Sequence, residues 1–427
     1  MKEEYLHFIW KHKLFGIAPL YTTNSEPIEV INPGTLNTDA GPDFFNAKIR
    51  IGETLWAGNV EIHVKTSDWY AHNHQNNKNY SNIILHVVYQ NDISELPDTK
   101  SSIPVLIIPI SKNLQYELAS INTEKNTLFC SNKITQISNS EITSYLDYIL
   151  IERFEEKYIE AKTTLQKTCN CWNTLFYNLL LKTFGGYTNN QAFALIAQRI
   201  SFQTLLHHSN NLTQIEALLF GVAGFLEGEP LDNYHKTLQN EFEFLKVKYS
   251  LKPLESHIWK FLRLRPTNFP TTRIAQLSAI IHKTKGMFIK VAQLNEINDI
   301  FTSLDVEIST YWKTHYHFGK EYNNHKVTSI GEQTKYVIVC NVIIPFLFTF
   351  HKENNNLEKI EEIIEWLYNL PSEKNSIISI WQANGINSNN MAQSQALYHL
   401  KSRYCNSKKC ISCRIGQKVL ASALKNE

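Results

Sequence analysis

The chain has 427 residues, of which 43% are hydrophobic and 12% aromatic, so it can bury more than one core and is not mainly disordered. Its formal net charge of +2 excludes a globally basic protein, and any contact with nucleic acid must come from a local basic patch. The odd number of cysteines, seven, and the polar residues in MKEEYLHFIWKHKLF argue against a secreted protein, and we expect it in the cytoplasm.

The N-terminal third has the pattern of a mixed helix and strand domain. Apolar spacing predicts one helix, and alternation or continuous apolar runs between Gly and Pro turns predict strands. These elements are a helix at 3–15 and strands at 28–31, 47–51, 55–65, 83–89 and 103–110. The second and third strands should form a hairpin around Gly52-Glu53, and the prolines that bound the last strand place it at a sheet edge.

From Ser140 onward the periodicity is helical. Predicted helices cover 141–168, 172–184, 189–198, 212–226, 232–249, 254–262, 271–283 and 294–302, and the last third is also mostly helical, with an exposed connection at 352–359. The longest apolar run, 336–350, is shorter than a membrane span and contains Asn341 and Pro345, so we predict a buried helix and no membrane contact. We expect three parts: an α/β domain at 1–135, a helical domain at 136–300 and a helical C-terminal region at 301–427.

Ionisable side chains are most concentrated between Gly41 and His86. Alternation along the strand at 55–65 places Glu61, His63 and Lys65 on one face, opposite three apolar residues. Asp43 precedes the neighbouring strand. Carboxylates on two adjacent strands are suitable ligands for Mg²⁺ or Mn²⁺, with His63 as ligand or base and Lys65 or His86 stabilising charge. The alternative is an ordinary solvated strand face.

Pro42-Asp43 followed by Glu61-x-His63 resembles the PD-(D/E)xK phosphodiesterase superfamily, with His63 where that superfamily has Lys. The resemblance covers about the first 110 residues and implies a nuclease-like mixed sheet, metal ligation by Asp43 and Glu61, and assistance from a Glu of the preceding helix, either Glu4 or Glu3. The expected fold class is therefore α/β (α+β), with a nuclease-like domain followed by a mostly α-helical one.

Over its full length the sequence is also similar to an uncharacterised bacterial family defined as a domain of unknown function. The matching blocks are GPDF at 41–44, GNVEIH at 58–63, SDW at 67–69, HNH at 72–74, ILHVV at 84–88, EALLFG at 216–221, RLRPTNFPTTRIAQL at 263–277, and the C-terminal YC, KKC and SCRIG. This resemblance groups the chain and implies no mechanism.

Other histidines leave alternatives open. Asp68, His72 and His74 follow the strand and would suit zinc or another transition metal, which gives a second enzyme hypothesis, a His/Asp metal-dependent hydrolase. This sequence pattern ranks His72 and His74 behind the strand residues. His86 interrupts an apolar run and needs a hydrogen-bond partner, either as a core histidine or as a residue that orients the site.

Cys405, Cys410 and Cys413 form a C-x4-C-x2-C pattern that predicts a C-terminal metal site. The spacing suits Zn²⁺ or an iron–sulfur cluster with a distant fourth ligand. The candidates for that ligand are His399, Cys340, Cys130 and the Cys169–Cys171 pair.

Two basic segments are candidates for nucleic-acid contacts, with Arg263, Arg265 and Arg273 in the first and Lys408 and Lys409 in the second. For the first segment, the alternative is that the arginines pair locally and organise helix packing. The leading hypothesis is thus a metal-dependent phosphodiesterase acting on nucleic acid. A catalytically inactive nuclease-like fold that binds nucleic acid or protein is the non-enzymatic alternative, and the sequence leaves the oligomeric state open.

Overall fold

The computed structural model describes residues 1–15, 18–93, 103–123, 128–131, 133–285, 291, 296–322 and 329–422. The chain packs into two compact units. The first comprises Met1–Tyr145, Ser379–Asn387 and Tyr398–Glu427, and the second comprises Leu146–Ile378 and Ser388–Leu397. The N-terminal part of the first unit ends at Tyr145, near the expected boundary at 135, and the C-terminal segment belongs to the same unit. The expected boundary at 300 lies inside the second unit.

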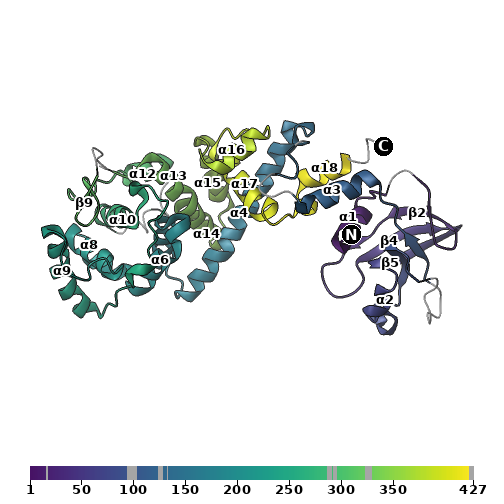
Figure 1. Cartoon of the computed structure of the whole chain (residues 1–427), viewed down its shortest axis with the longest axis horizontal. Coiled ribbons are helices and arrows are strands. Elements are labelled where there is room, and N and C mark those ends of the chain that lie inside the picture. The colour runs from purple at the N-terminus through teal and green to yellow at the C-terminus, as the bar shows by residue number, and fades with distance from the viewer. Residues whose placement is uncertain are drawn as a thin grey trace. The chain divides into compact units, whose positions relative to one another are not determined.

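The first unit is built on a mixed sheet with strand order β1-β2-β4-β5-β6-β7, and β3 pairs with β4 beside this path (Figure 1). The strands are β1 (Leu20–Tyr21), β2 (Pro27–Asn32), β3 (Thr35–Leu36), β4 (Phe44–Ile51), β5 (Thr54–Lys65), β6 (Ile83–Gln90) and β7 (Val105–Ile107). β4 and β5 form the predicted antiparallel hairpin, whereas β5, β6 and β7 are parallel. The predicted mixed sheet followed by helices is confirmed.

β7 lies at the end of the strand order, as predicted, but it is not a free edge. Thr22 forms an antiparallel bridge with Leu106, and the Thr23 N–H donates to the Val105 carbonyl at 2.8 Å. The two ends of the sheet therefore meet, which satisfies backbone groups that an open edge would expose.

Two helices cover the sheet, and they share one apolar core with it. α1 (Glu3–Lys11) buries five apolar side chains, and α3 (Lys112–Thr123) adds Leu114, Leu118 and Ile121. α1 is shorter than predicted because Lys13 takes the left-handed conformation and the Leu14 N–H bonds back to Ile9, which ends the helix. Leu420, from the far end of the chain, belongs to the same core.

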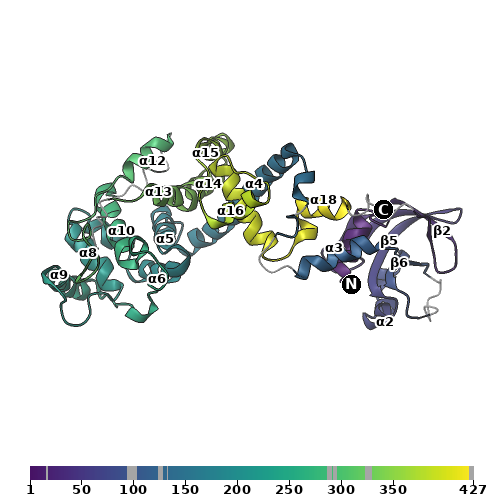
Figure 2. The ribbon, with the colours of Figure 1, turned by 45° about the horizontal axis from the view of Figure 1, so that its top comes forward.

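The second unit is helical (Figure 2). Helices in or entering it are α4 (Asn139–Lys167), α5 (Trp172–Phe184), α6 (Gly186–Arg199), α7 (Phe202–His207), α8 (Leu212–Val222), α9 (Asn233–Tyr249), α10 (Pro270–Thr284), α12 (Ile297–Ser303), α13 (Glu332–Ile338), α14 (Ile344–Glu353), α15 (Leu357–Asn369), α16 (Ser376–Ala383) and α17 (Met391–His399). A two-stranded sheet, β8 (His315–His317) with β9 (Lys320–Glu321), completes it.

The helix predicted at 254–262 is wrong. That segment holds only the 3₁₀ turn η4 (Ser256–Ile258), and it lies against the end of α8. The Leu254 N–H donates to the Val222 carbonyl at 2.8 Å, and Trp259 Nε1 donates to the Ala223 carbonyl at 2.8 Å. Tertiary hydrogen bonds thus replace the helical ones that local apolar spacing favours. Part of the helix predicted at 294–302 falls outside the described residues.

The apolar run 336–350 lies in a helix that continues from α13 through the π-helical turn η6 (Val339–Ile343) into α14. Residues Glu332–Glu353 are long and apolar enough for a membrane span by length and composition alone, but 61% of the most apolar window is buried inside the structure. It has the burial of a core helix, as predicted.

Candidate metal centre

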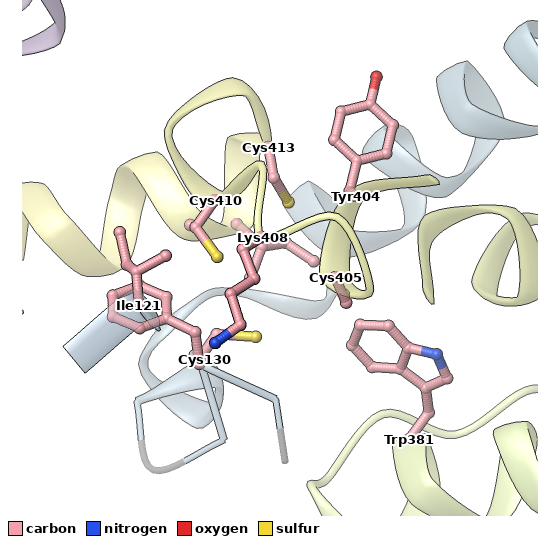
Figure 3. A pocket seen from close by; sticks show the side chains of 11 residues that line it. Ile121, Cys130, Trp381, Tyr404, Cys405, Lys408, Cys410 and Cys413 are labelled. Atoms are coloured by element: carbon pink, nitrogen blue, oxygen red, sulfur yellow. The ribbon is translucent and has the colours of Figure 1, made fainter. Parts of the chain in front are cut away.

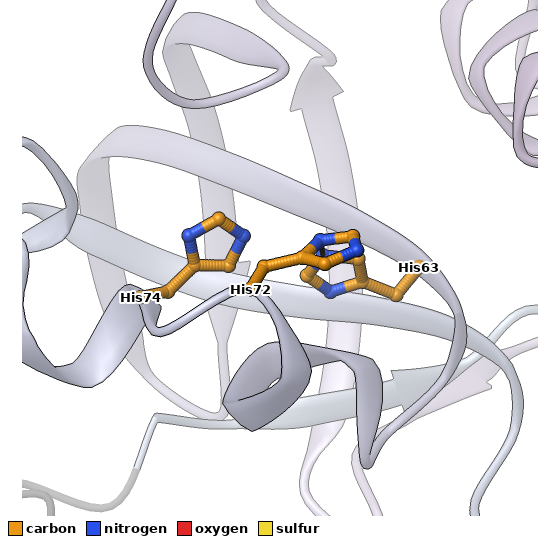
Figure 4. Close-up of side chains that lie close together, drawn as sticks. All are labelled: His63, His72 and His74. Carbon is orange, nitrogen blue, oxygen red and sulfur yellow. Dashed lines mark hydrogen bonds between the residues drawn. The ribbon is translucent and has the colours of Figure 1, made fainter.

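Three histidines converge where β5 ends and the following segment folds back over it (Figure 4). His63 projects from β5, whereas His72 and His74 follow the short helix α2 (Asp68–Ala71). Asn73, between them, adopts the left-handed conformation with φ 57°, which asparagine tolerates well, so the chain reverses at this point. The ligand atoms of the three imidazoles all lie within 4.8 Å of one another.

The same segment covers the polar face of β5. Glu61 is 4% exposed and His63 is 1% exposed, although alternation along the strand would also fit a solvated face. Trp69 is buried in α2, and its ring lies 5.3 Å from the ring of His74 and 5.4 Å from that of His86. The solvated-face interpretation is therefore wrong, because α2 and the turn η1 (His74–Asn76) cover this face.

Glu61 lies against two of the three histidines. His74 Nε2 lies 3.2 Å and His63 Nε2 lies 3.6 Å from Glu61 Oε1, and His63 Nε2 lies 3.2 Å from His72 Nδ1. Nitrogen or oxygen ligands placed tetrahedrally about 2.0–2.1 Å from one cation are separated from each other by about 3.3 Å. The three imidazoles therefore form a group compatible with a single transition-metal ion, and the Glu61 carboxylate lies beside two of them.

His86 is the hydrogen-bond partner of the other ring nitrogen of His63. His63 Nδ1 and His86 Nε2 are 2.9 Å apart, and one of them carries the shared proton. If His63 Nδ1 donates, its Nε2 lone pair faces the other donors, which is the tautomer that a metal needs. The structure thus favours the interpretation of His86 as an orienting residue, and it is fully buried.

Several buried nitrogen atoms at the site are incompletely paired. Within the described part of the chain, His86 Nδ1 and Trp69 Nε1 have no hydrogen-bond partner, whereas His74 Nε2 and His7 Nε2 have only carboxylate contacts, at 3.2 Å to Glu61 and 3.3 Å to Asp43. Buried polar atoms are normally paired, and such exceptions point to an ion or water that completes them. For His74, this Nε2 atom is also the one that lies beside Glu61 Oε1. The residues present therefore fit a bound cation.

The electrostatics of the site agree with that fit. Burial, and then the charge of Asp43, raise the pKa of Glu61 to about 9. Burial, followed by the neighbouring imidazoles, lowers the pKa of His63 to about 2, and burial lowers that of His86 to about 4. The imidazoles are thereby kept neutral and able to bind a cation, whereas Glu61 ionises only when positive charge is supplied.

Asp43 lies beside Glu61, as predicted. Its N–H donates to Glu61 Oε2 at 3.1 Å, and its Oδ2 accepts from the Ile62 N–H at 2.9 Å. The same Oδ2 lies 3.3 Å from His7 Nε2 of α1. Asp43 is therefore held between two strands and a helix, in a pair with His7, which no sequence pattern singled out.

Glu3, rather than Glu4, is the acidic residue of α1 near the site. Burial, and then the charge of Asp43, raise the pKa of Glu3, which places this carboxyl near the site. Glu4 instead pairs with Lys2 at 3.1 Å. The two candidates could not be separated in the sequence, because only the direction of the helix decides between them.

Other predicted residues lie elsewhere. Lys65 is exposed at the end of β5. Hydrogen bonds from Ser67, and to a smaller extent the charge of Lys65, lower the pKa of the nearby Asp92. The Lys65 N–H donates to Asp68 Oδ2 at 2.9 Å, so the Asp68 carboxylate fixes the start of α2. Cys405, Cys410 and Cys413 gather around a separate cavity of the first unit.

The predicted basic residues divide between internal and exposed positions. Arg273 donates to Asn268 at 2.7 Å, to Gln276 at 3.0 Å and to Thr334 at 3.0 Å, and burial lowers its pKa to about 10. Its guanidinium therefore organises the second unit. Arg263, Arg265 and Lys409 are exposed, and Lys408 lines the cysteine cavity. Glu255, the local acid considered for these arginines, pairs with His257.

The sequence signal for His72 and His74 was their i, i+2 spacing shortly after the strand. It did not show that the chain reverses between them and returns over β5, so their convergence with His63 became visible only in the folded chain.

A family model described as "Protein of unknown function (DUF2851)" matches residues 3–376. No curated protein and no solved structure matches the chain.

Proposed function

The chain belongs to the DUF2851 family, whose description names no reaction, and from the geometry of the site we propose that it is a metal-dependent hydrolase. One observation carries the proposal: His63, His72 and His74 bring three imidazole donors within 4.8 Å of one another, and Glu61 Oε1 lies 3.2 Å from His74 Nε2 and 3.6 Å from His63 Nε2. Three imidazoles with a carboxylate beside them favour Zn²⁺ or Mn²⁺ over Mg²⁺, which prefers oxygen ligands and keeps much of its water. Three histidine ligands leave a position of the cation open for water.

A bound divalent cation would supply Lewis acidity and lower the pKa of a coordinated water. The protein residues around it have separate tasks. His86 fixes the tautomer of His63 through their hydrogen bond, and Trp69 and Tyr80 pack against the imidazole of His74. This packing excludes water from one side of the site, where electrostatic interactions are consequently stronger.

Asp43 and His7 are suited to move a proton. Both side chains are about one-fifth exposed, at 19% and 21%, whereas Glu61 and His63 are almost fully buried. The pair is therefore more exposed than the residues at the centre, and a carboxylate next to an imidazole is a common general base. We propose that Asp43 and His7 accept the proton of the attacking water.

The substrate class that we propose is a phosphodiester of nucleic acid. It rests on the resemblance of Pro42-Asp43 and Glu61-x-His63 to the PD-(D/E)xK phosphodiesterases, and it is supported by the position of Asp43 directly beside Glu61 on adjacent strands. His63 stands where that superfamily has Lys, and its neutral imidazole suits metal ligation. Lys65, at the exposed end of the strand, is available to contact a bound phosphate.

The test measures metal content and turnover in the same preparations. We expect about one zinc or manganese ion bound by the N-terminal site and cleavage of single- or double-stranded DNA or RNA that stops in EDTA. His72→Ala and Glu61→Gln should lose that metal and the cleavage, and Asp43→Asn should keep the metal but lose the cleavage. His257→Ala, at a histidine that is 76% exposed, is the matched control and should retain both.

Two outcomes would contradict the proposal. Metal content and turnover that are unchanged in His72→Ala would show that the histidines hold no functional cation. Nucleic-acid binding that persists in EDTA without turnover under any metal would instead identify a binding module, and its affinity should then fall steeply with salt.

A further inference from the structure

Four cysteines line one cavity of the first unit (Figure 3). Cys130 lies between α3 and the turn η3 (Ile134–Gln136). The other three follow α17: Cys405 ends the π-helical turn η7 (Leu400–Cys405), Cys410 begins η8 (Cys410–Ser412), and Cys413 precedes α18 (Arg414–Ser422). All seven cysteines of the chain are free thiols, so no disulfide explains the grouping.

The loop that carries the three C-terminal cysteines is tightly built. Lys408 has a positive φ of 54°, and the Lys409 N–H returns to the Tyr404 carbonyl at 2.9 Å. A Cβ on Gly416 would lie 2.2 Å from the carbonyl oxygen of Cys410, so only glycine lets α18 approach this turn. Gln417 Nε2 donates to the Ile411 carbonyl at 2.8 Å and closes the loop on the same helix. The backbone thus presents Cys410 and Cys413 in a fixed geometry.

Hydrogen-bond donors surround the sulfur of Cys413. The N–H groups of Ile415 and Gly416, at the start of α18, and the hydroxyl of Tyr145 donate to it. Such donors hold the Cys413 sulfur in place beside the cavity that the other three cysteines also line.

From this arrangement we propose that Cys130, Cys405, Cys410 and Cys413 together ligate one iron–sulfur cluster. The four cysteines line one cavity, and three of them come from the turn between η7 and α18 whereas Cys130 comes from a separate segment. Four thiolates are the usual ligands of an iron–sulfur cluster, and a set of nearby cysteines with one distant in the sequence is a common arrangement for it. Zn²⁺ on the same four thiolates is the competing occupant, and metal analysis distinguishes the two.

The cluster would link the N-terminal third of the chain to its C-terminal segment within the first unit. α18 packs against α3, and Leu420 of α18 is fully buried in the core that also contains α1 and the sheet. Cys130 follows α3, and Cys413 precedes α18. Ligation would therefore fix both helices from their ends, as a covalent cross-link does, and it would be independent of the hydrolase site.

The experiment is purification of the full chain without oxygen, followed by analysis of iron, acid-labile sulfide and zinc, visible absorption, and electron paramagnetic resonance after reduction with dithionite. We expect iron and sulfide in equal amounts and a visible absorption that bleaches on reduction. Cys130→Ser should lower both contents at least several-fold, and Cys169→Ser, at an exposed cysteine of the second unit, should leave them unchanged.

The iron, sulfide and zinc contents of the unmodified chain are the first test, so the test stands even if a variant fails to fold. Zinc bound without iron or sulfide, or no metal on the cysteines, would overturn the cluster. Iron and sulfide that persist unchanged in folded Cys130→Ser would overturn the assignment of the fourth ligand. His72→Ala separates this centre from the hydrolase site, because it should retain the iron and sulfide.

Discussion

Glu61 and His63 are held in opposite protonation states by the same burial. The pKa of Glu61 is raised from 4.5 to about 9, and that of His63 is lowered from 6.5 to about 2. In the metal-free protein, the stability that protonated Glu61 contributes is fully present below pH 4.5 and is lost as the pH rises toward 9. The stability linked to neutral His63 is present above pH 6.5 and is lost as the pH falls toward 2.

The first prediction concerns the pH dependence of metal binding. Because a cation must displace the proton of Glu61, the association constant for Zn²⁺ at this site should rise about tenfold per pH unit between pH 6.5 and 8.5. Isothermal titration calorimetry in buffers of different ionisation enthalpy would measure the released proton. Glu61→Gln should bind weakly and without this slope, and it should make the metal-free protein more stable at pH 8. A pH-independent affinity of the unmodified protein would contradict the role of Glu61.

The second prediction concerns His86 as a positioning residue. His86→Ala should weaken metal binding at the histidine centre by about 10–100-fold, because His63 loses the partner that fixes its tautomer. His86→Gln should restore part of the affinity, since its amide can also accept from His63 Nδ1. Equilibrium dialysis with Zn²⁺ measures both variants. Equal affinities in the alanine variant and the unmodified protein would reduce His86 to a packing residue.

At the scale of elements, the parallel pair of β5 and β6 positions the site. Their register places Glu61 opposite His86 and His63 opposite Val88. Gly58 permits this close pairing, because a Cβ there would lie 2.4 Å from the Ile84 side chain and 2.9 Å from the Asn82 carbonyl oxygen. At Gly58, therefore, no side chain separates β5 from β6.

The third prediction follows from that contact. Gly58→Ala should lower the free energy of unfolding by about 1–3 kcal/mol, because the strand must shift to relieve the overlap. It should also weaken metal binding, since Glu61 is three residues further along the same strand. Gly331→Ala is the control, because an added Cβ there meets nothing within 4 Å. Urea denaturation followed by circular dichroism measures both, and equal midpoints would contradict the prediction.

At the scale of the whole molecule, the first unit is assembled from both ends of the chain. The segment Tyr398–Glu427 belongs with Met1–Tyr145, and the helical second unit is formed by the sequence between them. Leu420 is 0% exposed within the core that supports α1 and the sheet. The stability of the histidine site therefore depends on residues more than 300 positions away in the sequence.

The fourth prediction tests this dependence. Leu420→Ala should destabilise the first unit by about 2–5 kcal/mol, the usual cost of a buried leucine. Hydrogen–deuterium exchange of β4, β5 and β6 should become faster, whereas helices of the second unit such as α8 and α9 should keep their protection. Leu262→Ala, at a leucine that is 83% exposed, should change neither. Unchanged exchange in the strands would show that α18 does not support the sheet.

Local periodicity predicted the longer strands and most helices, but not α2, α3 or the short strands β1, β3, β8 and β9. The hairpin of β4 and β5, the buried strand β6 and the change to helices near residue 140 follow from alternation, apolar runs and turn residues, which act over a few neighbouring positions. The same rules placed Asp43 beside Glu61, because hairpin pairing fixes which residues of adjacent strands meet. They failed at 254–262, where hydrogen bonds to α8 replaced those of a helix.

The sequence by itself determined which residues could carry chemistry: the carboxylates and histidines between Gly41 and His86, and the C-terminal cysteines. Only the tertiary structure decided how they combine. The reversal at Asn73 brought His72 and His74 over β5, and the return of the C-terminal segment brought Cys405, Cys410 and Cys413 to Cys130. Both events depend on long-range packing of apolar residues, and that packing leaves no signature in the spacing of the ligands themselves.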